Sequence, residues 1–254
     1  METIKLIILA VVQGATELLP ISSSAHLLLV SQLLDFEADT LFMTTLHFGT
    51  TIAILIYFWK TLFKDFFKKE KLPFYLKILA ASIPAGLVGF LLLDTIENIF
   101  RSNIYISVSL ILWGIVMIIL ENSRKHTETS VEDVSWKNSL IMGFAQIIAL
   151  IPGTSRSGIT SIAGMMSGVN KYTALQFSFL LGLPVLLGAS LYEFYKEFPT
   201  QPFHWQEILG MFIAGMVGYL FLKLLERFKK SKWLTFFGVY RIILGLIVLA
   251  TILF

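Results

Sequence analysis

A run of polar residues interrupts the first apolar segment of the chain, between Leu6–Val12 and Leu27–Val30. The run reads Q-G-A-T-E-L-L-P-I-S-S-S-A-H from Gln13 to His26, and it carries a carboxylate, an amide, three hydroxyls, an imidazole and a proline. Such groups are costly in a lipid bilayer, so they usually face a protein interior or a wet cavity and mark a functional site. The rest of the fold must therefore give this run a polar environment lined by protein.

The local structure of this run is predicted to be a helix, a break and a second helix. Gln13 and Glu17 lie four residues apart, so on a helix they project from one face. Pro20 interrupts that helix, because it lacks an N–H group and its ring clashes with the preceding turn. The three serines that follow can cap a new helix running toward Leu34. We therefore predict a broken, re-entrant hairpin.

The composition of the whole chain is typical of an all-α polytopic membrane protein. Of its 254 residues, 56% are hydrophobic and 15% are charged, and the mean hydropathy is +0.77. The chain has no cysteine, which excludes disulfides, thiolate chemistry and a metal site built from cysteine. The first apolar run has no small-residue cleavage site, so we expect no removable signal peptide.

Six further apolar segments are long enough to cross a bilayer. They are Leu41–Trp59, Phe74–Leu93, Ile104–Leu120, Tyr172–Tyr192, Glu207–Leu225 and Leu234–Phe254. A second broken hairpin is predicted before the fourth of them, with a helix over Asn138–Ile151, a break at Pro152–Gly158 and a short helix to Gly168. A broken hairpin followed by three spans therefore occurs twice.

The two halves are predicted to form an inverted repeat within one integral-membrane domain, residues 1–254. They cover residues 1–121 and 137–254, and the polar linker 122–136 joins them. Each half contributes three spans and a hairpin that returns to its own side, so the second half must be inverted. Paired interruptions in two halves indicate a binding site at the repeat interface.

The alignment of the two halves rests on the two breaks. Placing Pro20 over Pro152 lays Ser22-Ser23 on Thr154-Ser155, and Gly49 then falls one position off Gly182. The identity between the halves is slight. The repeated order of elements is the stronger argument for a repeat.

Lysine and arginine are concentrated in the loops on one side of this topology. These basic segments are Lys60–Lys71, Glu121–Lys137, Lys171 and Arg227–Lys232, whereas the loops Asp35–Asp39, Asp94–Asn103 and Glu193–Gln206 on the other side are poor in basic residues. The positive-inside rule makes the basic side cytoplasmic, so both termini and the mouth of the first hairpin face outside. Each loop would lie on the same side of the membrane if both arms of a hairpin crossed the bilayer fully. The loop charges therefore do not show that the hairpins are re-entrant. The positive-inside rule also accounts for the lysines behind the net charge of +3, so this charge does not imply a nucleic-acid partner.

The two breaks carry complementary chemical groups. Glu17, with Gln13 beside it, offers oxygen ligands suited to a hard cation such as Mg²⁺ or Ca²⁺. Arg156 offers a guanidinium whose planar fork matches two phosphate oxygens. Helices that begin after Ser22–Ser24 and Thr154–Ser157 would point free N–H groups and positive dipole ends into one cavity. Such a site favours an anion.

Hydroxyl and imidazole groups near the breaks are candidates for catalysis. Ser23, Ser155 and Thr160 could donate hydrogen bonds to the anion, or one serine could be a nucleophile. His26 could act as base, acid or nucleophile, since the unperturbed pKa of histidine lies nearest neutrality.

The same groups also have structural interpretations. Glu17 and Arg156 could form an ion pair that locks the hairpins together. The serines could be helix caps and contacts between helices. His26 could be a satisfied core histidine, and His47, alone on a spanning helix, is more readily interpreted as one.

Two motifs of the chain resemble the signature motifs of a known family. Q-G-A-T-E-L-L-P-I-S-S-S-A-H-L and P-G-T-S-R-S-G look like those of the undecaprenyl-diphosphate phosphatases, also known as bacitracin-resistance proteins. The resemblance covers the whole chain, including the polar linker and the segment F-S-F-L-L-G-L-P after the second motif. It implies removal of the terminal phosphate of undecaprenyl diphosphate at the outer face of the bacterial plasma membrane. This reaction recycles the lipid carrier for peptidoglycan and gives bacitracin resistance.

The resemblance also implies roles for individual residues. The family's acidic pair corresponds to Gln13 and Glu17, its serine and histidine to Ser23 and His26, and its phosphate-binding serine and arginine to Ser155 and Arg156. Many members have a second glutamate where this chain has Gln13, and that difference bears on how a metal is held.

Two functions follow from this reasoning. The favoured one is hydrolysis of a polyprenyl diphosphate in a wet cavity roofed by the hairpins. The alternative is a transporter or flippase for a polyprenyl phosphate, because inverted repeats with broken helices are typical of alternating-access carriers. Partners expected are the lipid substrate and the membrane, and a homodimer is allowed. The predicted catalytic residues are Glu17, Ser23, His26 and Arg156, the predicted substrate-binding residues are Ser22, Ser24, Ser155, Arg156, Ser157 and Thr160, and the predicted metal ligands are Gln13 and Glu17.

Overall fold

The computed structural model describes residues 2–36, 38–100, 102–121, 130–199, 202–227 and 232–253. Over these residues the chain forms α-helices and two short 3₁₀ helices, η1 (Lys69–Lys71) and η2 (Val131–Asp133), and no strand. The all-α prediction is confirmed. Most of the predicted linker 122–136 lies outside the described residues.

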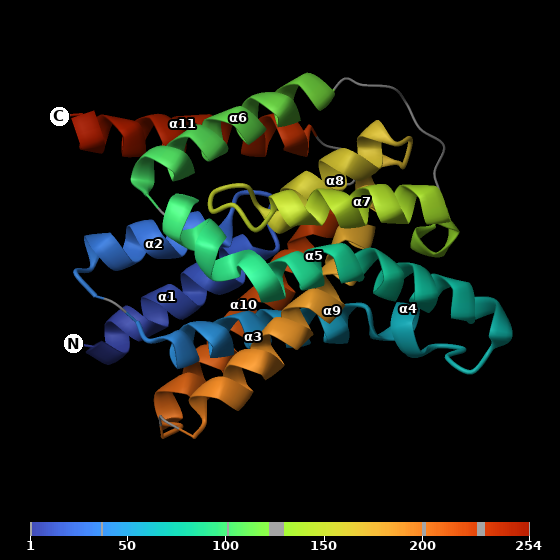
Figure 1. Ribbon diagram of the computed structural model, residues 1–254, viewed down its shortest axis with the longest axis horizontal. Coiled ribbons are helices and arrows are strands. Elements are labelled where there is room, and N and C mark those ends of the chain that lie inside the picture. Colours follow the sequence, from blue (N-terminus) through green and yellow to red (C-terminus); the bar gives the residue numbers. More distant parts are fainter. Residues whose placement is uncertain are drawn as a thin grey trace.

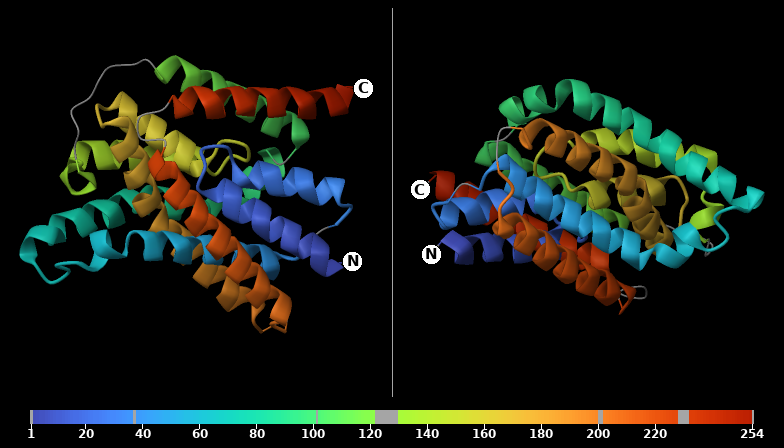
Figure 2. Two further views of the ribbon diagram at one scale, coloured as in Figure 1. Left: turned by 180° about the vertical axis from the view of Figure 1, so that it is seen from behind. Right: turned by 90° about the horizontal axis from the view of Figure 1, so that it is seen from below.

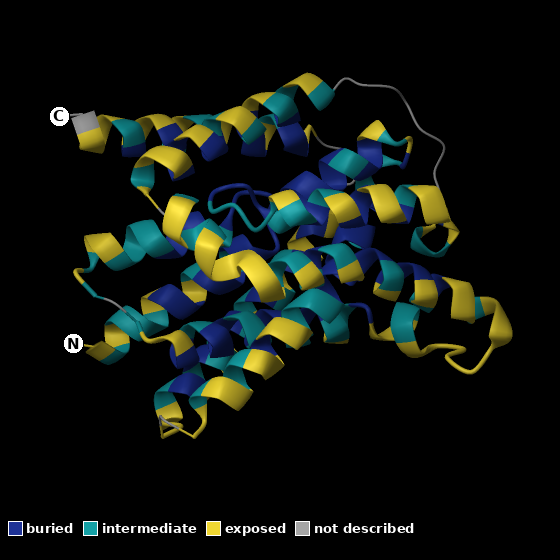
Figure 3. Cartoon of the chain, in the orientation of Figure 1, coloured by how far each residue is buried: buried dark blue, intermediate teal, exposed yellow. Residues whose placement is uncertain are grey.

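Six helices are long and apolar enough to cross a membrane. They are α3 (Thr40–Tyr57), α5 (Leu72–Phe100), α6 (Asn103–Leu120), α9 (Lys171–Glu197), α10 (Trp205–Leu225) and α11 (Trp233–Leu253). Each corresponds to one predicted span. Large apolar side chains remain exposed along their outer faces, as expected where lipid replaces water, and the buried residues gather in the interior (Figure 3).

Two of the predicted loops are partly helical instead. α5 continues from the predicted end at Leu93 to Phe100, through most of the expected loop Asp94–Asn103, and α9 continues past Tyr192 to Glu197. A helix needs apolar residues only while it crosses the bilayer, and its backbone hydrogen bonds can continue in water. The hydropathy pattern indicates where the apolar part of each segment ends, whereas these two helices continue beyond that point.

The two predicted breaks separate pairs of short helices. The first pair is α1 (Glu2–Glu17) and α2 (Ser23–Leu33), and the second is α7 (Trp136–Ile148) and α8 (Arg156–Met166). A helix of 11 residues, such as α2 or α8, is about 16 Å long, roughly half of a bilayer's hydrocarbon thickness. The length favours re-entrant hairpins, which stay a prediction.

Contacts between helices occur in matching pairs, in which each helix of one half is replaced by its counterpart in the other half. α1 packs on α10 as α7 packs on α5, and α3 packs on α10 as α9 packs on α5. α3 also contacts its counterpart α9, and α6 contacts its counterpart α11. This pattern supports the predicted repeat. Its inversion relative to a membrane stays a prediction.

The two breaks meet near the centre of the molecule. In Figure 1 the loop between α1 and α2 lies beside the loop between α7 and α8, below the α6 and α11 pair, and the views in Figure 2 agree. A hydrogen bond joins the first loop to the start of α8, because Ser157 Oγ donates to the carbonyl oxygen of Leu19 at 3.2 Å. The fold therefore brings together two segments more than a hundred residues apart.

Candidate active site

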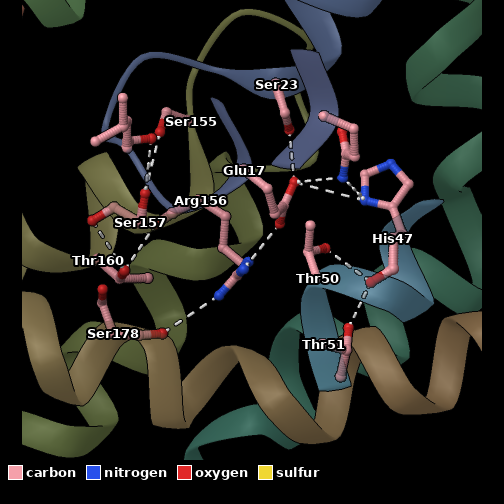
Figure 4. Close-up of polar contacts among 12 residues, drawn as sticks. Glu17, Ser23, His47, Thr50, Thr51, Ser155, Arg156, Ser157, Thr160 and Ser178 are labelled. Atoms are coloured by element: carbon pink, nitrogen blue, oxygen red, sulfur yellow. Dashed lines mark hydrogen bonds and ion pairs between the residues drawn. The ribbon is translucent and has the colours of Figure 1, made fainter. Parts of the chain in front are cut away.

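The carboxylate of Glu17 is the centre of the polar network between the two breaks. Glu17 is the last residue of α1, and its side chain is 6% exposed. Its Oε1 atom accepts a hydrogen bond from Arg156 Nη2 at 2.9 Å, and its Oε2 atom accepts one from Ser23 Oγ at 2.6 Å (Figure 4). Gln13 Nε2 donates to the same Oε2 atom at 3.2 Å. The structural interpretation of Glu17 and Arg156 as an ion pair is therefore confirmed. The same carboxylate also accepts a hydrogen bond from the hydroxyl of Ser23.

His47 lies in this network, so its interpretation as a core histidine is wrong. Its Nδ1 atom lies 2.9 Å from Gln13 Nε2 and 3.5 Å from Glu17 Oε2, and its side chain is 33% exposed. Because the amide Nε2 is a donor, Nδ1 accepts, and the ring proton of the neutral tautomer lies on Nε2. The sequence did carry a signal for this residue: Thr40, Thr44, His47 and Thr51 recur every three or four positions, so they share one polar face of the helix.

Arg156 reaches Glu17 from the second hairpin. It is the first residue of α8, and its Nη1 atom donates to the carbonyl oxygen of Ser178 on α9 at 3.3 Å. Its Nε atom is buried and has no hydrogen-bond partner among the described residues. The guanidinium is therefore held by protein through one N–H of each Nη atom, and its buried Nε–H has no acceptor among the described residues.

The two short inner helices begin in the same unusual way. Their N-cap residues, Ser22 and Ser155, have φ values of 73° and 72°, a region that residues other than glycine rarely adopt. Each side chain accepts from a backbone N–H three residues on, at Ala25 and Gly158. Ser22 thus matches Ser155, which shifts the predicted alignment of the halves by one residue.

This alignment makes Ser23 the counterpart of Arg156. Each is the first residue of its inner helix, and each donates to the carboxylate of Glu17. The repeated backbone therefore delivers two different groups, a hydroxyl and a guanidinium, to one acceptor.

The other predicted substrate-binding hydroxyls are not brought to Glu17. Ser155 caps α8, Ser157 Oγ donates to the Leu19 carbonyl, and Thr160 Oγ1 donates to the Arg156 carbonyl at 2.7 Å. Ser24 Oγ is 3.2 Å from Ser22 Oγ, and Ser24 lines the cavity described below. The interpretation of the serines as helix caps is confirmed for Ser22 and Ser155. The binding of substrate by these hydroxyl groups stays a prediction.

His26 makes two hydrogen bonds away from Glu17. Its Nδ1 atom lies 2.7 Å from the carbonyl oxygen of Ser22, and its Nε2 atom lies 2.7 Å from the hydroxyl of Tyr240 on α11. A carbonyl oxygen only accepts, so Nδ1 carries the proton and Nε2 accepts from Tyr240. The two rings also stack, with centroids 5.7 Å apart. The histidine beside the carboxylate is thus His47, whereas the sequence pointed to His26.

Arg241 is a buried cation that the sequence reasoning missed. It lies on α11 with 0% of its surface exposed. Its Nη1 atom donates to the carbonyl oxygen of Pro20 at 3.0 Å, and its Nη2 atom donates to those of Gly153 and Thr154 at 2.7 and 3.0 Å. One side chain therefore ties both breaks together. Its signal was a single arginine inside an apolar span.

A cavity of about 900 Å³ adjoins this network. His47, which contacts Glu17, and Ser24, which follows Ser23, both line it. Its walls come from α2, α3, α5, α6 and the second break, and they include apolar side chains such as Leu27, Met43 and Ile106. Polar groups beside apolar walls suit an amphipathic ligand.

The donor set suits a divalent ion only in part. Among the described residues, no group of three or more His, Cys, Asp or Glu side chains is placed to hold a metal. Glu17 supplies a carboxylate, and the Oε1 atom of Gln13 is buried without a partner. Mg²⁺ is commonly bound by one or two carboxylates together with water and substrate phosphates. Glu17 and Gln13 therefore fit an ion that is bound jointly by protein and substrate better than an ion bound by protein ligands alone.

Comparison with known proteins places the chain in one family. Residues 6–247 match the model described as Bacitracin resistance protein BacA. Undecaprenyl-diphosphatase 1 of Clostridioides difficile (strain 630) is 36% identical, over 98% of this chain and 96% of that protein. An undecaprenyl-diphosphatase of Wolinella succinogenes is 39% identical over 98% of both chains. Undecaprenyl-diphosphatase 1 of Pseudoalteromonas translucida is 40% identical, over 96% of this chain and 97% of that protein.

Proposed function

The chain belongs to the bacitracin resistance protein BacA family, and we propose that the network around Glu17 is where it performs its reaction. The protein is a multi-pass membrane hydrolase that converts undecaprenyl diphosphate to undecaprenyl phosphate and phosphate. This reaction recycles the lipid carrier of cell-wall synthesis, and the family name implies bacitracin resistance. The names of the relatives support the phosphatase prediction and not the transporter alternative.

One observation supports the site above all others, the chain of contacts from Ser23 through Glu17 to Arg156. A hydroxyl 2.6 Å from a carboxylate has the geometry of a nucleophile with its base. A guanidinium on the other oxygen of that carboxylate places a phosphate-binding group next to the nucleophile. The two hairpins supply these groups together, so neither half forms the site alone.

The proposed reaction begins with attack by Ser23. Its Oγ atom forms a bond to the terminal phosphorus, and its proton passes to Glu17. The bond between that phosphorus and the bridging oxygen breaks, which releases undecaprenyl phosphate. Glu17 passes this proton to the departing undecaprenyl phosphate and is again a carboxylate. Water then attacks the phosphorus of the phosphoserine and gives a proton to Glu17. The bond from phosphorus to Ser23 Oγ breaks, Glu17 returns the proton to Ser23, and inorganic phosphate is released. Arg156 stabilises the charge on the phosphoryl oxygens with N–H groups of its guanidinium that no protein acceptor holds.

Ser23 is a better candidate for the nucleophile than His26. Both ring nitrogens of His26 make hydrogen bonds, to the Ser22 carbonyl and to the Tyr240 hydroxyl. Ser23 Oγ, in contrast, already contacts a carboxylate that can take its proton. In this proposal His26 and Tyr240 fix the start of α2, and His47 supports Glu17 through Gln13.

We also propose that a divalent ion, Mg²⁺ or Ca²⁺, binds together with the diphosphate. Glu17 and Gln13 are the residues that would hold it, because they supply the carboxylate and the unused amide oxygen. When bound, the ion would neutralise part of the charge on the diphosphate. The predicted binding of substrate by the serine hydroxyls of the breaks stays part of the proposal.

The substrate's placement and the protein's location complete the proposal. The diphosphate lies at the end of the cavity formed by Ser24 and His47, and the isoprenoid tail leaves between apolar walls toward lipid. The membrane is the bacterial plasma membrane. Basic residues in Lys60–Lys71 and Glu121–Lys137 support a site that faces outside. A homodimer stays a prediction.

The proposal is tested by phosphate release from purified protein in detergent with undecaprenyl diphosphate and a divalent ion. Ser23→Ala is expected to be nearly inactive, whereas Ser24→Ala keeps substantial activity. Acid quenching during turnover of substrate labelled in the terminal phosphate should leave label on the parent protein and none on Ser23→Ala. If Ser23→Ala stays active while His26→Ala does not, water or His26 is the attacking group instead.

A further inference from the structure

Four aromatic side chains lie exposed just beyond the end of α3. Trp59 and Phe63 lie on the short helix α4 (Trp59–Phe63), and Phe66 and Phe67 lie in the loop that follows. Their exposed fractions are 59%, 41%, 46% and 96% in that order. The rings form a continuous row, with centroid separations of 4.2 Å from Trp59 to Phe63, 6.1 Å on to Phe66 and 5.3 Å on to Phe67. Monomeric proteins rarely leave such a contiguous apolar surface in water.

Lysines alternate with these aromatic residues. Lys60, Lys64 and Lys69 are exposed and make no ion pair within the described part of the chain. Lys68 and Lys71 do make ion pairs, with Asp65 at 3.1 Å and Glu132 at 3.0 Å. We call Trp59, Phe63, Phe66, Phe67, Lys60, Lys64 and Lys69 together the aromatic–lysine surface.

The position of this surface fixes its depth relative to a membrane. α3 ends at Tyr57 and α5 begins at Leu72, and both are long enough to cross a bilayer. α4 runs across the direction of these two helices in both Figure 1 and Figure 2. A short helix that crosses the ends of two spans lies at the boundary between lipid tails and headgroups, where aromatic side chains are enriched.

We propose that the aromatic–lysine surface binds the anionic headgroups of phospholipids in the cytoplasmic leaflet. The aromatic rings enter the boundary of the acyl chains, which removes them from water, and the three lysines without an ion pair meet the phosphate charge of the headgroups. Charge complementarity decides the occupant, because the exposed lysines of this segment outnumber its exposed acids, Asp65 and Glu70. A neutral lipid would satisfy the rings and leave that excess positive charge unpaired. This binding is separate from the phosphatase site and does not depend on the catalytic roles proposed above.

The experiment measures lipid binding to the full chain in detergent micelles. The parent is titrated with phosphatidylglycerol or with phosphatidylcholine, and native mass spectrometry counts the lipids that stay bound. Thermal unfolding of the same samples reports stabilisation. The parent is expected to retain phosphatidylglycerol in preference to phosphatidylcholine and to unfold at a higher temperature with the anionic lipid.

Two triple variants separate this surface from a general effect of charge. Replacing Lys60, Lys64 and Lys69 by Gln should weaken phosphatidylglycerol binding by about fivefold per lysine. The matched control replaces Lys137, Lys196 and Lys223 by Gln, which are exposed lysines elsewhere with the same total charge. It should bind as the parent does, and both variants should keep phosphatase activity.

A third variant tests the rings. Phe67→Ser removes the most exposed of them, so folding should be unaffected while retention of phosphatidylglycerol falls. Equal loss of lipid in both triple variants, or no preference of the parent for phosphatidylglycerol, would overturn the proposal. Loss of a dimer in the first triple variant, with lipid binding unchanged, would assign the surface to a second copy of the chain.

Discussion

The guanidinium of Arg156 lies directly against the backbone of Gly182 on α9. A β-carbon at position 182 would collide with the Nη1 and Cζ atoms of that side chain. One turn earlier on the same helix, the carbonyl oxygen of Ser178 accepts from Nη1 at 3.3 Å. Glycine at position 182 therefore leaves the space through which Arg156 reaches Glu17.

Gly182→Ala is expected to lower phosphatase activity although it changes no charged group. The guanidinium must move away from α9, and misplacement by about 1 Å can reduce a rate on the order of a hundredfold. The measurement is steady-state phosphate release, with thermal unfolding to verify the fold. Gly188→Ala is the matched control, because it lies on the same helix and a β-carbon there meets nothing within 4 Å. Equal activity of both variants and the parent would show that Arg156 does not need this position.

Arg156→Lys is expected to lose most activity while keeping the positive charge. Lysine presents a single ammonium, which cannot contact Glu17, the Ser178 carbonyl and a phosphate oxygen from one planar group. The loss should appear in kcat as well as KM, because the proposed contact strengthens as charge develops on the phosphoryl group. Turnover close to that of the parent would contradict a role for Arg156 in gripping phosphate.

Arg241→Met is expected to lower both stability and activity. Loss of the guanidinium leaves the buried carbonyls of Pro20, Gly153 and Thr154 without this donor, at about 1–3 kcal/mol for each carbonyl left unsatisfied. The two breaks then lose a common support, so kcat should fall more than KM rises. Arg241→Lys should recover part of the stability and little of the activity, since one ammonium cannot hold both loops. Full activity in Arg241→Met would show that the breaks are positioned without it.

The sequence was most informative where the physical signal is local. Apolar length predicted all six spans, and prolines followed by serines predicted both breaks, because these features act within a few residues. The proximity of Glu17 and Arg156 was also predictable, since charged groups within an apolar region must find polar surroundings.

Other features depend on which helix faces meet, and the sequence carries little information on that. His47 shares one face of α3 with Thr40, Thr44 and Thr51, so the pattern marks a polar face. The pattern does not say which neighbour that face meets. The contact of Arg241 with both breaks joins residues more than eighty positions apart. The orientation of His26 toward Tyr240 likewise follows from the packing of α11.

The orientation of the chain in the membrane can be tested with single cysteines. The chain has none of its own, so one can be placed at Ala38 and, in a separate variant, one at Ser130. Loop charges predict that an impermeant thiol reagent applied to intact cells labels the first and not the second. Disrupted cells serve as the control, in which both positions should react. Labelling of Ser130→Cys alone in intact cells would place the first hairpin mouth in the cytoplasm.

Gln13 provides the sharpest test of how a divalent ion is held. Its Nε2 atom contacts both Glu17 Oε2 and His47 Nδ1, while its Oε1 atom is buried without a partner. Gln13→Ala should therefore cost less activity than Glu17→Ala, which should abolish it, and should mainly raise the ion concentration required. The measurement is a divalent-ion titration of phosphate release for each variant and the parent.

Gln13→Glu should shift that titration in the opposite direction. It would place a second carboxylate beside Glu17 Oε2, where the parent has an amide nitrogen at 3.2 Å. Two negative charges this close repel each other in a site of low dielectric constant, and a divalent cation relieves the repulsion. The variant should therefore reach half-maximal activity at a lower ion concentration, and its thermal stability should fall more than that of the parent when the ion is chelated. If its midpoint equals that of the parent while Gln13→Ala is as inactive as Glu17→Ala, Gln13 is not a tunable ligand. Its amide would then act by orienting Glu17 and His47 through the two contacts that it already makes.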